Sequence, residues 1–378
     1  MESLYRTASN FGDWLGAQSL IYFPVVSVLI LAAIILGAVP VLVLAERRGA
    51  AWIQRRSGPN RVGPFGLFQT VADAIKLIFK EANLPKRAHL FLFLLAPALA
   101  VIPPFVALAV IPLGGDVLFG PNAYPFQGVN LSVGLLFFLA ISSLHVYSVL
   151  TAGWASNNKF SLMGGLRSSS QMISYEIVIG MAIVSLVITY GTLDLREIVY
   201  LQQSTSGALP AWGVFKQPVV FVLLWICSFA ETNRLPFDLP EGESELVAGY
   251  HTEYSGLTFA LFMMGEYVAM LAASAFLSTL FLGGFNIPFI TEAELLKFFL
   301  DMNIEQTAAS IMTVACQFAA LAAKIGFFMW VFIWVRWSLP RFRYDQLMSL
   351  GWKVLLPISV MNVIGTMLYS YFAAGGAA

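Results

Sequence analysis

The chain has 378 residues, of which 58% are hydrophobic and only 11% are charged. A soluble domain carries about 25% charged residues, and its surface needs roughly that share to stay dispersed in water, so the composition excludes an ordinary soluble protein. The 21 basic residues balance the 21 acidic ones, so the net charge gives no argument for a nucleic-acid partner or an acidic partner.

Eight apolar stretches are long enough to cross a bilayer, whose hydrocarbon core of about 30 Å takes about 20 helical residues. They lie near residues 21–45, 90–113, 130–153, 171–190, 214–230, 255–281, 308–335 and 350–374. Each must be a helix, because an open sheet edge cannot satisfy its backbone groups in lipid. The sequence therefore predicts an all-α, polytopic membrane protein of eight transmembrane helices, in which residues 1–378 form a single integral membrane domain.

A segment with one apolar and one polar face follows the first stretch. Residues 65–81, FGLFQTVADAIKLIFKE, place their apolar and charged side chains on opposite sides of a helix. Such a short amphipathic helix is expected to lie in the membrane interface rather than to cross the bilayer. It either anchors the protein to the membrane surface or borders a lateral entrance for a lipid-soluble molecule.

The basic residues are distributed unevenly over the loops. The odd-numbered loops hold fifteen of them, nine in the first loop alone, whereas the opposite side holds four, Arg6, Arg196, Lys216 and Lys297. The positive-inside rule therefore places the odd-numbered loops in the cytoplasm or its equivalent and both termini on the outer side.

Residues that hold redox cofactors are scarce. Cys227 and Cys316 fall in separate predicted helices, and two thiols are too few for an iron–sulfur cluster. The three histidines lie in different segments without the spacing of a haem or zinc site. The sequence has no dinucleotide-binding glycine motif and no Walker loop. We expect no metal, haem, flavin, NADH or iron–sulfur site on this chain.

Three ionisable residues, Glu176, Glu266 and Lys324, lie inside predicted helices, where a charge is costly unless it is paired or hydrated. Helical rise counted from the predicted ends places Glu266 about 16 Å deep and Lys324 about 18 Å deep. We therefore expect these two residues to share one buried polar cavity. The alternative is an ion pair that only joins two helices.

Residues 231–255 form an acidic loop on the basic side of the membrane. The loop sets six acids against Arg234: Glu231, Asp238, Glu241, Glu243, Glu245 and Glu253. In an extended backbone three of these acids point to the same side, and adjacent carboxylates do not all stay ionised cheaply. Because Glu176 and Glu266 continue the series inward, the pattern indicates a proton path into the membrane. The alternative is a solvated loop of ordinary acids.

Several blocks of sequence together resemble one family. They are LAERR at 44–48, GPNRVGPFGLFQ at 58–69, ADAIKLIFKE at 72–81, GWASNNKFSLMGGLRSSSQMISYE at 153–176, AETNRLPFDLPEGESELVAGY at 230–250, EY at 266–267 and PRFRYDQLM at 340–348. The chain resembles a family of membrane subunits of NADH-quinone oxidoreductase, the respiratory complex I, whose mitochondrial member is called NADH dehydrogenase subunit 1. The outer loops 114–130, 191–213 and 282–307 carry none of these blocks.

The resemblance implies a membrane subunit of a proton-pumping NADH:quinone oxidoreductase, a translocase that is inactive as a single chain. It implies that the chain forms the chamber where quinone enters and is reduced, and that it couples this reduction to proton translocation. Ubiquinone or menaquinone would be the substrate. The implied partners are hydrophilic redox subunits with the terminal iron–sulfur cluster, small membrane subunits and antiporter-like subunits, in the inner membrane of a bacterium. The mitochondrial inner membrane is the alternative.

The resemblance also assigns roles to individual residues, although it places no catalytic residue on this chain alone. The quinone entrance would involve Arg47, Arg56, Asp73, Phe259 and Phe262. The chamber loops would contribute Arg234, Arg341 and Arg343. The proton relay would comprise Glu176, Glu231, Asp238, Glu241, Glu243, Glu245, Glu253 and Glu266, to which the depth argument adds Lys324. Packing is the alternative role for the two phenylalanines, and membrane anchoring or partner docking is the alternative for Arg47 and Arg56.

Two other functions remain open at the level of the sequence. Related membrane subunits occur in energy-converting hydrogenases, where ferredoxin supplies electrons and no quinone is reduced. A stand-alone secondary transporter is the third interpretation, but the sequence shows neither an inverted repeat nor a matching pair of broken helices.

Overall fold

The structure, a computed structural model, describes residues 2–81, 84–86, 88–119, 122–203, 205–206, 209–239, 242 and 246–375. Seven segments of this described part are long and apolar enough to cross a membrane. They are Val25–Ile53, Leu90–Leu108, Gly134–Ala155, Lys159–Tyr190, Gly256–Phe281, Gln306–Ser338 and Tyr344–Ala373. The prediction of a helical, multi-pass membrane protein is confirmed.

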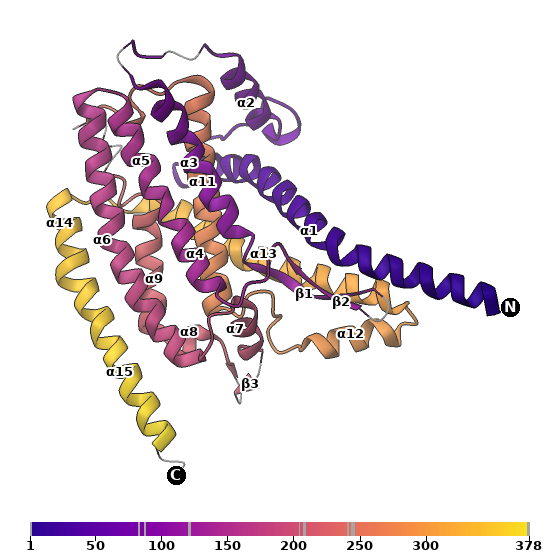
Figure 1. The fold of residues 1–378 in the computed structure, drawn as a ribbon. Helices are drawn as coiled ribbons and strands as arrows, with labels where there is room; N and C mark the ends of the chain where they lie inside the picture. The colour runs from indigo at the N-terminus through magenta and orange to yellow at the C-terminus, as the bar shows by residue number, and fades with distance from the viewer. Residues whose placement is uncertain are drawn as a thin grey trace.

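The helices form an upright bundle that two oblique helices cross (Figure 1). The bundle comprises α3 (Leu90–Leu108), α4 (Gly134–Ser142), α5 (Leu144–Ala155), α6 (Lys159–Tyr190), α9 (Pro218–Glu231) and α11 (Gly256–Phe281). The oblique helices are α1 (Glu2–Ile53) and α13 (Gln306–Ser338), and both contact α11. The chain ends along α6 with α14 (Tyr344–Ser349), a π-helical segment (Leu350–Leu355) and α15 (Leu356–Gly375).

Shorter elements lie at the two ends of the bundle. Near one end, a 3₁₀ turn (Pro64–Gly66) leads into α2 (Gln69–Phe79), which contacts α1 and α11, and a second 3₁₀ turn (Gly249–His251) precedes α11. Near the other end lie α7 (Leu195–Leu201), α8 (Gly213–Lys216) and α12 (Glu292–Asp301). Figure 1 shows α2 and α7 at opposite ends, so the segments assigned by sequence to opposite sides of the membrane are separated in space.

The stretch near 214–230, expected to be the fifth of eight spans, is interrupted. The backbone leaves the helical region at Gln217 (φ −138°, ψ 65°), which separates α8 from α9. Helix α9 has 14 residues, about 21 Å at 1.5 Å per residue, which is shorter than the hydrocarbon core. By length, the described part of the chain therefore has seven candidate spans and this shorter apolar helix.

Two small antiparallel hairpins, which the all-α prediction missed, occur in loops that the sequence assigns to the outer side. Strand β1 (Pro112–Phe119) pairs with β2 (Asn122–Gln127), and β3 (Thr205–Ser206) pairs with β4 (Leu209–Pro210). The first hairpin packs on α13, where Gly115 N donates to Gln317 Oε1 at 2.7 Å. A Cβ on Gly115 would lie 2.2 Å from Glu292 Oε1 of α12, so any larger residue here would have to displace the Glu292 side chain.

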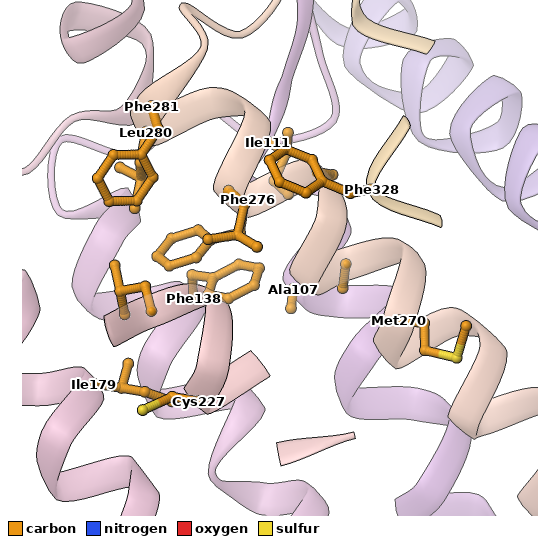
Figure 2. Packing of buried hydrophobic residues seen from close by; sticks show 14 of the residues in the cluster. Ala107, Ile111, Phe138, Ile179, Cys227, Met270, Phe276, Leu280, Phe281 and Phe328 are labelled. Carbon is orange, nitrogen blue, oxygen red and sulfur yellow. The ribbon is translucent and has the colours of Figure 1, made fainter. Parts of the chain in front are cut away.

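Aromatic and small side chains fill the interior of the bundle. Figure 2 shows Phe138 of α4 against Phe276 of α11, stacked with ring centroids 4.0 Å apart. Small side chains let the backbones of α3 and α11 approach closely. A Cβ on Gly265 of α11 would lie 2.5 Å from the carbonyl oxygen of Ala100 in α3. Small residues at such crossings allow membrane helices to gain van der Waals contact.

We expect Gly265→Ala to lower the thermal stability of the detergent-solubilised protein by several degrees, because the added methyl group forces α3 and α11 apart. Gly180→Ala is the matched control, since a Cβ on Gly180 meets no atom within 4 Å and alanine favours a helix by about 1 kcal/mol over glycine. Equal melting temperatures for the two variants would contradict the close α3–α11 contact.

Candidate functional site

Four charged side chains from four segments meet at the end of the bundle near α2. Arg234, which follows α9, donates from Nη1 to both carboxylate oxygens of Glu46 in α1, at 2.9 and 3.1 Å. Its Nε forms an ion pair with Glu266 of α11. Arg336 in the last turn of α13 pairs with the same Glu46. We call these four residues, together with Tyr267, the charge cluster.

Tyr267 completes the charge cluster. Its hydroxyl donates to Glu46 Oε2 at 2.8 Å, and the Arg234 guanidinium carbon lies 4.9 Å from the centre of its ring. Glu46 therefore accepts hydrogen bonds from two arginines and a phenol, while Arg234 bridges two carboxylates. Two acids balance two bases, so the cluster is neutral as a unit.

Burial makes these pairings necessary. Arg234 is 4% exposed and Glu46 is 7% exposed, and a buried charge without a partner is strongly unfavourable. Burial opposes the charge on Arg234, but the carboxylates of Glu266 and Glu46 outweigh it and raise the pKa of this guanidinium above its ordinary value. Arg234 is thus a fixed positive charge in the loop that joins α9 to α11.

A cavity of about 380 Å³ opens beside the charge cluster. Its wall includes all five cluster residues, the basic side chains of Arg47 and Arg56, and the apolar side chains of Met263 and Trp337. Ligand pockets of this size combine an apolar lining with a few placed polar groups. The cavity can therefore receive a molecule with a polar head and apolar parts, and its arginines can donate hydrogen bonds to oxygen atoms of that head.

Helix α2 stands next to this cavity and is tied to α1. Arg47 forms an ion pair with Asp73 of α2, and Gln69 Nε2 donates to the same carboxylate at 3.1 Å. Apolar side chains of α2 remain exposed, namely Val71, Ile75, Ile78 and Phe79. Of the predicted quinone-entrance residues, Arg47 and Arg56 line the cavity. Asp73 does not line it but forms the ion pair with Arg47.

The two predicted phenylalanines lie elsewhere. Phe262 is buried in an aromatic group with Tyr250, His251 and Tyr254, and its ring centroid is 4.8 Å from that of Tyr254. Phe259 packs edge-on against His251 with centroids 5.6 Å apart. Neither side chain lines the cavity beside the charge cluster. These contacts correspond to the packing role that the sequence left as the alternative.

The acids of the relay series are spread over several environments. Glu231 hydrogen-bonds Ser142 and lies within electrostatic range of Glu176. Asp238 accepts from Arg341 Nη2 at 3.1 Å, and Glu253 accepts from Asn158 Nδ2 at 2.7 Å. Glu241, Glu243 and Glu245 lie outside the residues that the structure describes. Exposed Arg343 has its Nε 3.7 Å from Asp345.

The prediction that Glu266 and Lys324 share one buried polar cavity is wrong. Lys324 Nζ donates to the carbonyl oxygens of Leu282, Gly284 and Asn286 at 2.7, 2.7 and 2.6 Å, beyond the end of α11. Along α11, Leu282 lies about 24 Å from Glu266 at 1.5 Å per residue. The similar depths counted from the sequence did not place the two residues together, because α13 runs obliquely across the bundle (Figure 1). Helical rise along an oblique helix does not measure depth in the membrane.

Sequence reasoning missed three members of the charge cluster. Glu46 stands at the end of the first apolar stretch, and Arg336 was counted only as a basic residue of a loop. Tyr267 gave no signal of its own, although it adjoins Glu266. The available signal was that Glu46 and Arg336 both stand where an apolar stretch ends on the same predicted side of the membrane. Periodicity and spacing did not indicate that α1 and α13 meet at these ends.

Residues 25–367 match the sequence profile of the NADH dehydrogenase family. The chain belongs to this family. A protein of Bdellovibrio bacteriovorus named as a subunit of NADH-quinone oxidoreductase is 47% identical over 358 residues, which cover 89% of this chain and 93% of that protein. An NADH-quinone oxidoreductase subunit of Salinibacter ruber is 44% identical over 92% of this chain and 95% of its own length. The NADH-quinone oxidoreductase subunit 8 of Rhodothermus marinus is 46% identical over 90% and 94%.

For this member of the NADH dehydrogenase family, we expect Arg234→Gln to cost about 3–5 kcal/mol, because it leaves the buried carboxylate of Glu46 and the partly buried carboxylate of Glu266 without their shared partner. Heat denaturation of the assembled protein in detergent, followed by loss of soluble material, measures the effect. The control is Arg343→Gln, which removes an exposed pair whose contribution is about 0–1 kcal/mol. A similar loss of stability in both variants would contradict the structural role of Arg234.

Proposed function

We propose that this chain is the membrane subunit of a proton-pumping NADH-quinone oxidoreductase that forms the quinone chamber with hydrophilic partner subunits. The observation that carries the proposal is the cavity beside the charge cluster, whose lining combines arginines with the apolar side chains of Met263 and Trp337. A quinone has two carbonyl oxygens on a ring with an apolar tail. Guanidinium groups can donate to those oxygens, while apolar side chains contact the ring.

The exposed apolar face of α2 supplies a route to this chamber. In the proposal α2 lies in the membrane interface with Val71, Ile75 and Ile78 toward lipid, as amphipathic helices do. A quinone diffusing in the bilayer then passes α2 and reaches the cavity, whose wall includes residues of α1, α11 and α13. Because α1 also carries Arg47, the Arg47–Asp73 pair fixes one edge of this entrance. Phe259 and Phe262 contribute to the entrance through packing.

The charge cluster supplies the coupling step. Reduction of a quinone to a quinol takes two electrons and two protons, and the partner subunits supply the electrons. A change of charge in the cavity alters the balance between Glu46, Glu266 and their shared Arg234. Arg234 lies three residues after Glu231 in the chain, so a shift of Arg234 reaches Glu231 and, through it, Glu176, which are both partly buried. The loop 231–255, with Glu241, Glu243 and Glu245, completes the relay in this proposal.

Topology and partners follow the same reasoning. We propose that α9 completes an eighth crossing together with the segments that flank it, and that both termini face the outer side. The basic first loop then faces hydrophilic subunits with the terminal iron–sulfur cluster, and other membrane subunits take up the pumping. The relatives are bacterial proteins named as quinone oxidoreductase subunits, which favours a bacterial inner membrane and argues against the hydrogenase and transporter alternatives. A role of Lys324 in the relay stays a prediction.

We expect Met263→Trp to raise the KM for a short-tailed quinone several-fold while leaving electron transfer to an artificial acceptor upstream of quinone unchanged. The larger side chain fills part of the cavity. Met361→Trp on the exposed face of α15 is the matched control. An unchanged KM in the assembled Met263 variant would remove this cavity as the quinone chamber.

We expect Glu266→Gln to lower the number of protons translocated per electron at least two-fold, because Arg234 loses one of its two charged partners. Proton uptake and NADH oxidation, measured together in membrane vesicles, give this ratio. Asp345→Asn, which changes an exposed acid, serves as the control. A normal rate together with a normal ratio in the Glu266 variant would refute the coupling role of the cluster.

A further inference from the structure

A second, smaller cavity lies inside the bundle, away from the charge cluster. It has a volume of about 40 Å³ and is bordered by α3, α4, α5, α6, α9 and α11. Its polar wall consists of Ser142, His145, Ser228, Glu231 and Thr232. Phe138, Ile179 and Phe276, which Figure 2 shows within the packed core, belong to its apolar wall. None of its lining residues lines the larger cavity.

His145 of α5 lines this cavity and has a ring nitrogen that no hydrogen bond from the described residues occupies. Its Nδ1 is buried and has no hydrogen-bond partner among the described residues, whereas the imidazole does hydrogen-bond the backbone of Ala100 in α3. Nε2 therefore makes that bond as a donor to the carbonyl group, which assigns the neutral ring a proton on Nε2 and a lone pair on Nδ1. A buried polar atom without a partner calls for an explanation, and Glu231 on the same cavity supplies one.

The cavity is large and polar enough to connect the two groups through water. One water occupies about 10–15 Å³ of such a volume, so about 40 Å³ accommodates about three. The hydroxyl groups of Ser228 and Thr232 donate to carbonyl oxygens of their own helix, which leaves their oxygen lone pairs available as acceptors, and the hydroxyl group of Ser142 hydrogen-bonds Glu231. Each water then finds the two to four polar partners that it needs.

We propose that His145 is a proton-accepting station of the Glu231 relay. In the step, the carboxylic acid of Glu231 gives its proton to a cavity water, and a water in the same chain gives a proton to His145 Nδ1. A neutral acid and a neutral imidazole thus become a carboxylate and an imidazolium, and no charge leaves the cavity. The inference rests on the proposed relay through Glu231 and adds the group that receives its proton.

The neighbouring groups decide when this transfer is favourable. Among the residues that the structure describes, Glu176 and Cys227 lie within electrostatic range of Glu231, and α3 and α11 contribute only apolar residues to the cavity wall. When Glu176 is ionised, its negative charge holds the proton on Glu231. When Glu176 is neutral, the carboxylate of Glu231 forms more easily and the transfer of its proton to His145 costs less.

The test compares His145→Gln with Glu231→Gln in the whole complex reconstituted in vesicles. Glutamine places an amide donor where Nε2 lies, so the bond to Ala100 is kept while the proton acceptor is lost. We expect the number of protons translocated per electron to fall at least two-fold in both variants, with quinone reduction retained under an uncoupler. His89→Gln, outside the cavity, is the matched control and keeps the normal ratio.

A second variant separates proton transfer from packing. His145→Ala lowers the same ratio, and added imidazole restores it, because imidazole fits the space left by the ring and accepts a proton. Loss without rescue in an assembled His145→Ala complex would overturn the role of His145. A normal ratio in His145→Gln together with a lowered ratio in Glu231→Gln would also overturn it but leave the proposed function standing. Normal ratios in both variants would overturn the relay itself.

Discussion

The ion pairs of Arg234 hold together segments that are far apart in the chain. Arg234 lies between Glu46 of α1 and Glu266 of α11, and Arg336 of α13 reaches the same Glu46. Because Glu46 and Arg234 are buried at the centre of these pairs, each segment can keep its position only while the others keep theirs. The oblique crossing of α1 and α13 over the upright bundle, and the cavity beside that crossing, depend on this arrangement.

The shared ion pairs also allow the charge cluster to respond to a charge in the neighbouring cavity. An isolated buried pair has one stable arrangement, whereas Glu46 and Arg234 each have two partners of opposite charge. A charge placed in the neighbouring cavity changes which partner each residue prefers. Lys324 provides a contrast, because three carbonyl groups satisfy its ammonium completely, and nothing in those partners can titrate.

The two cavities are joined by a short piece of chain. Glu231 is the last residue of α9 and lines the smaller cavity. Arg234 follows it by three residues and lines the larger cavity beside the charge cluster. A displacement of Arg234 is therefore carried to Glu231 by covalent connection rather than through a long series of contacts. In the proposed function, this proximity links the quinone chamber to the acids of the proton relay inside the bundle.

The sequence by itself determined the membrane class, most of the spans and the family resemblance, because hydrophobic length and charge placement are local properties of a chain in a bilayer. It also singled out Arg47, Arg56, Arg234 and Glu266, which line one cavity. It did not separate Glu266 from Lys324, and it overlooked Glu46, Arg336 and His145. Their roles depend on helix tilt and on which side chains face one another, and packing between distant segments sets both. Only the tertiary structure decided that α1 and α13 cross beside Arg234, and that the histidine on α5 faces the same cavity as Glu231.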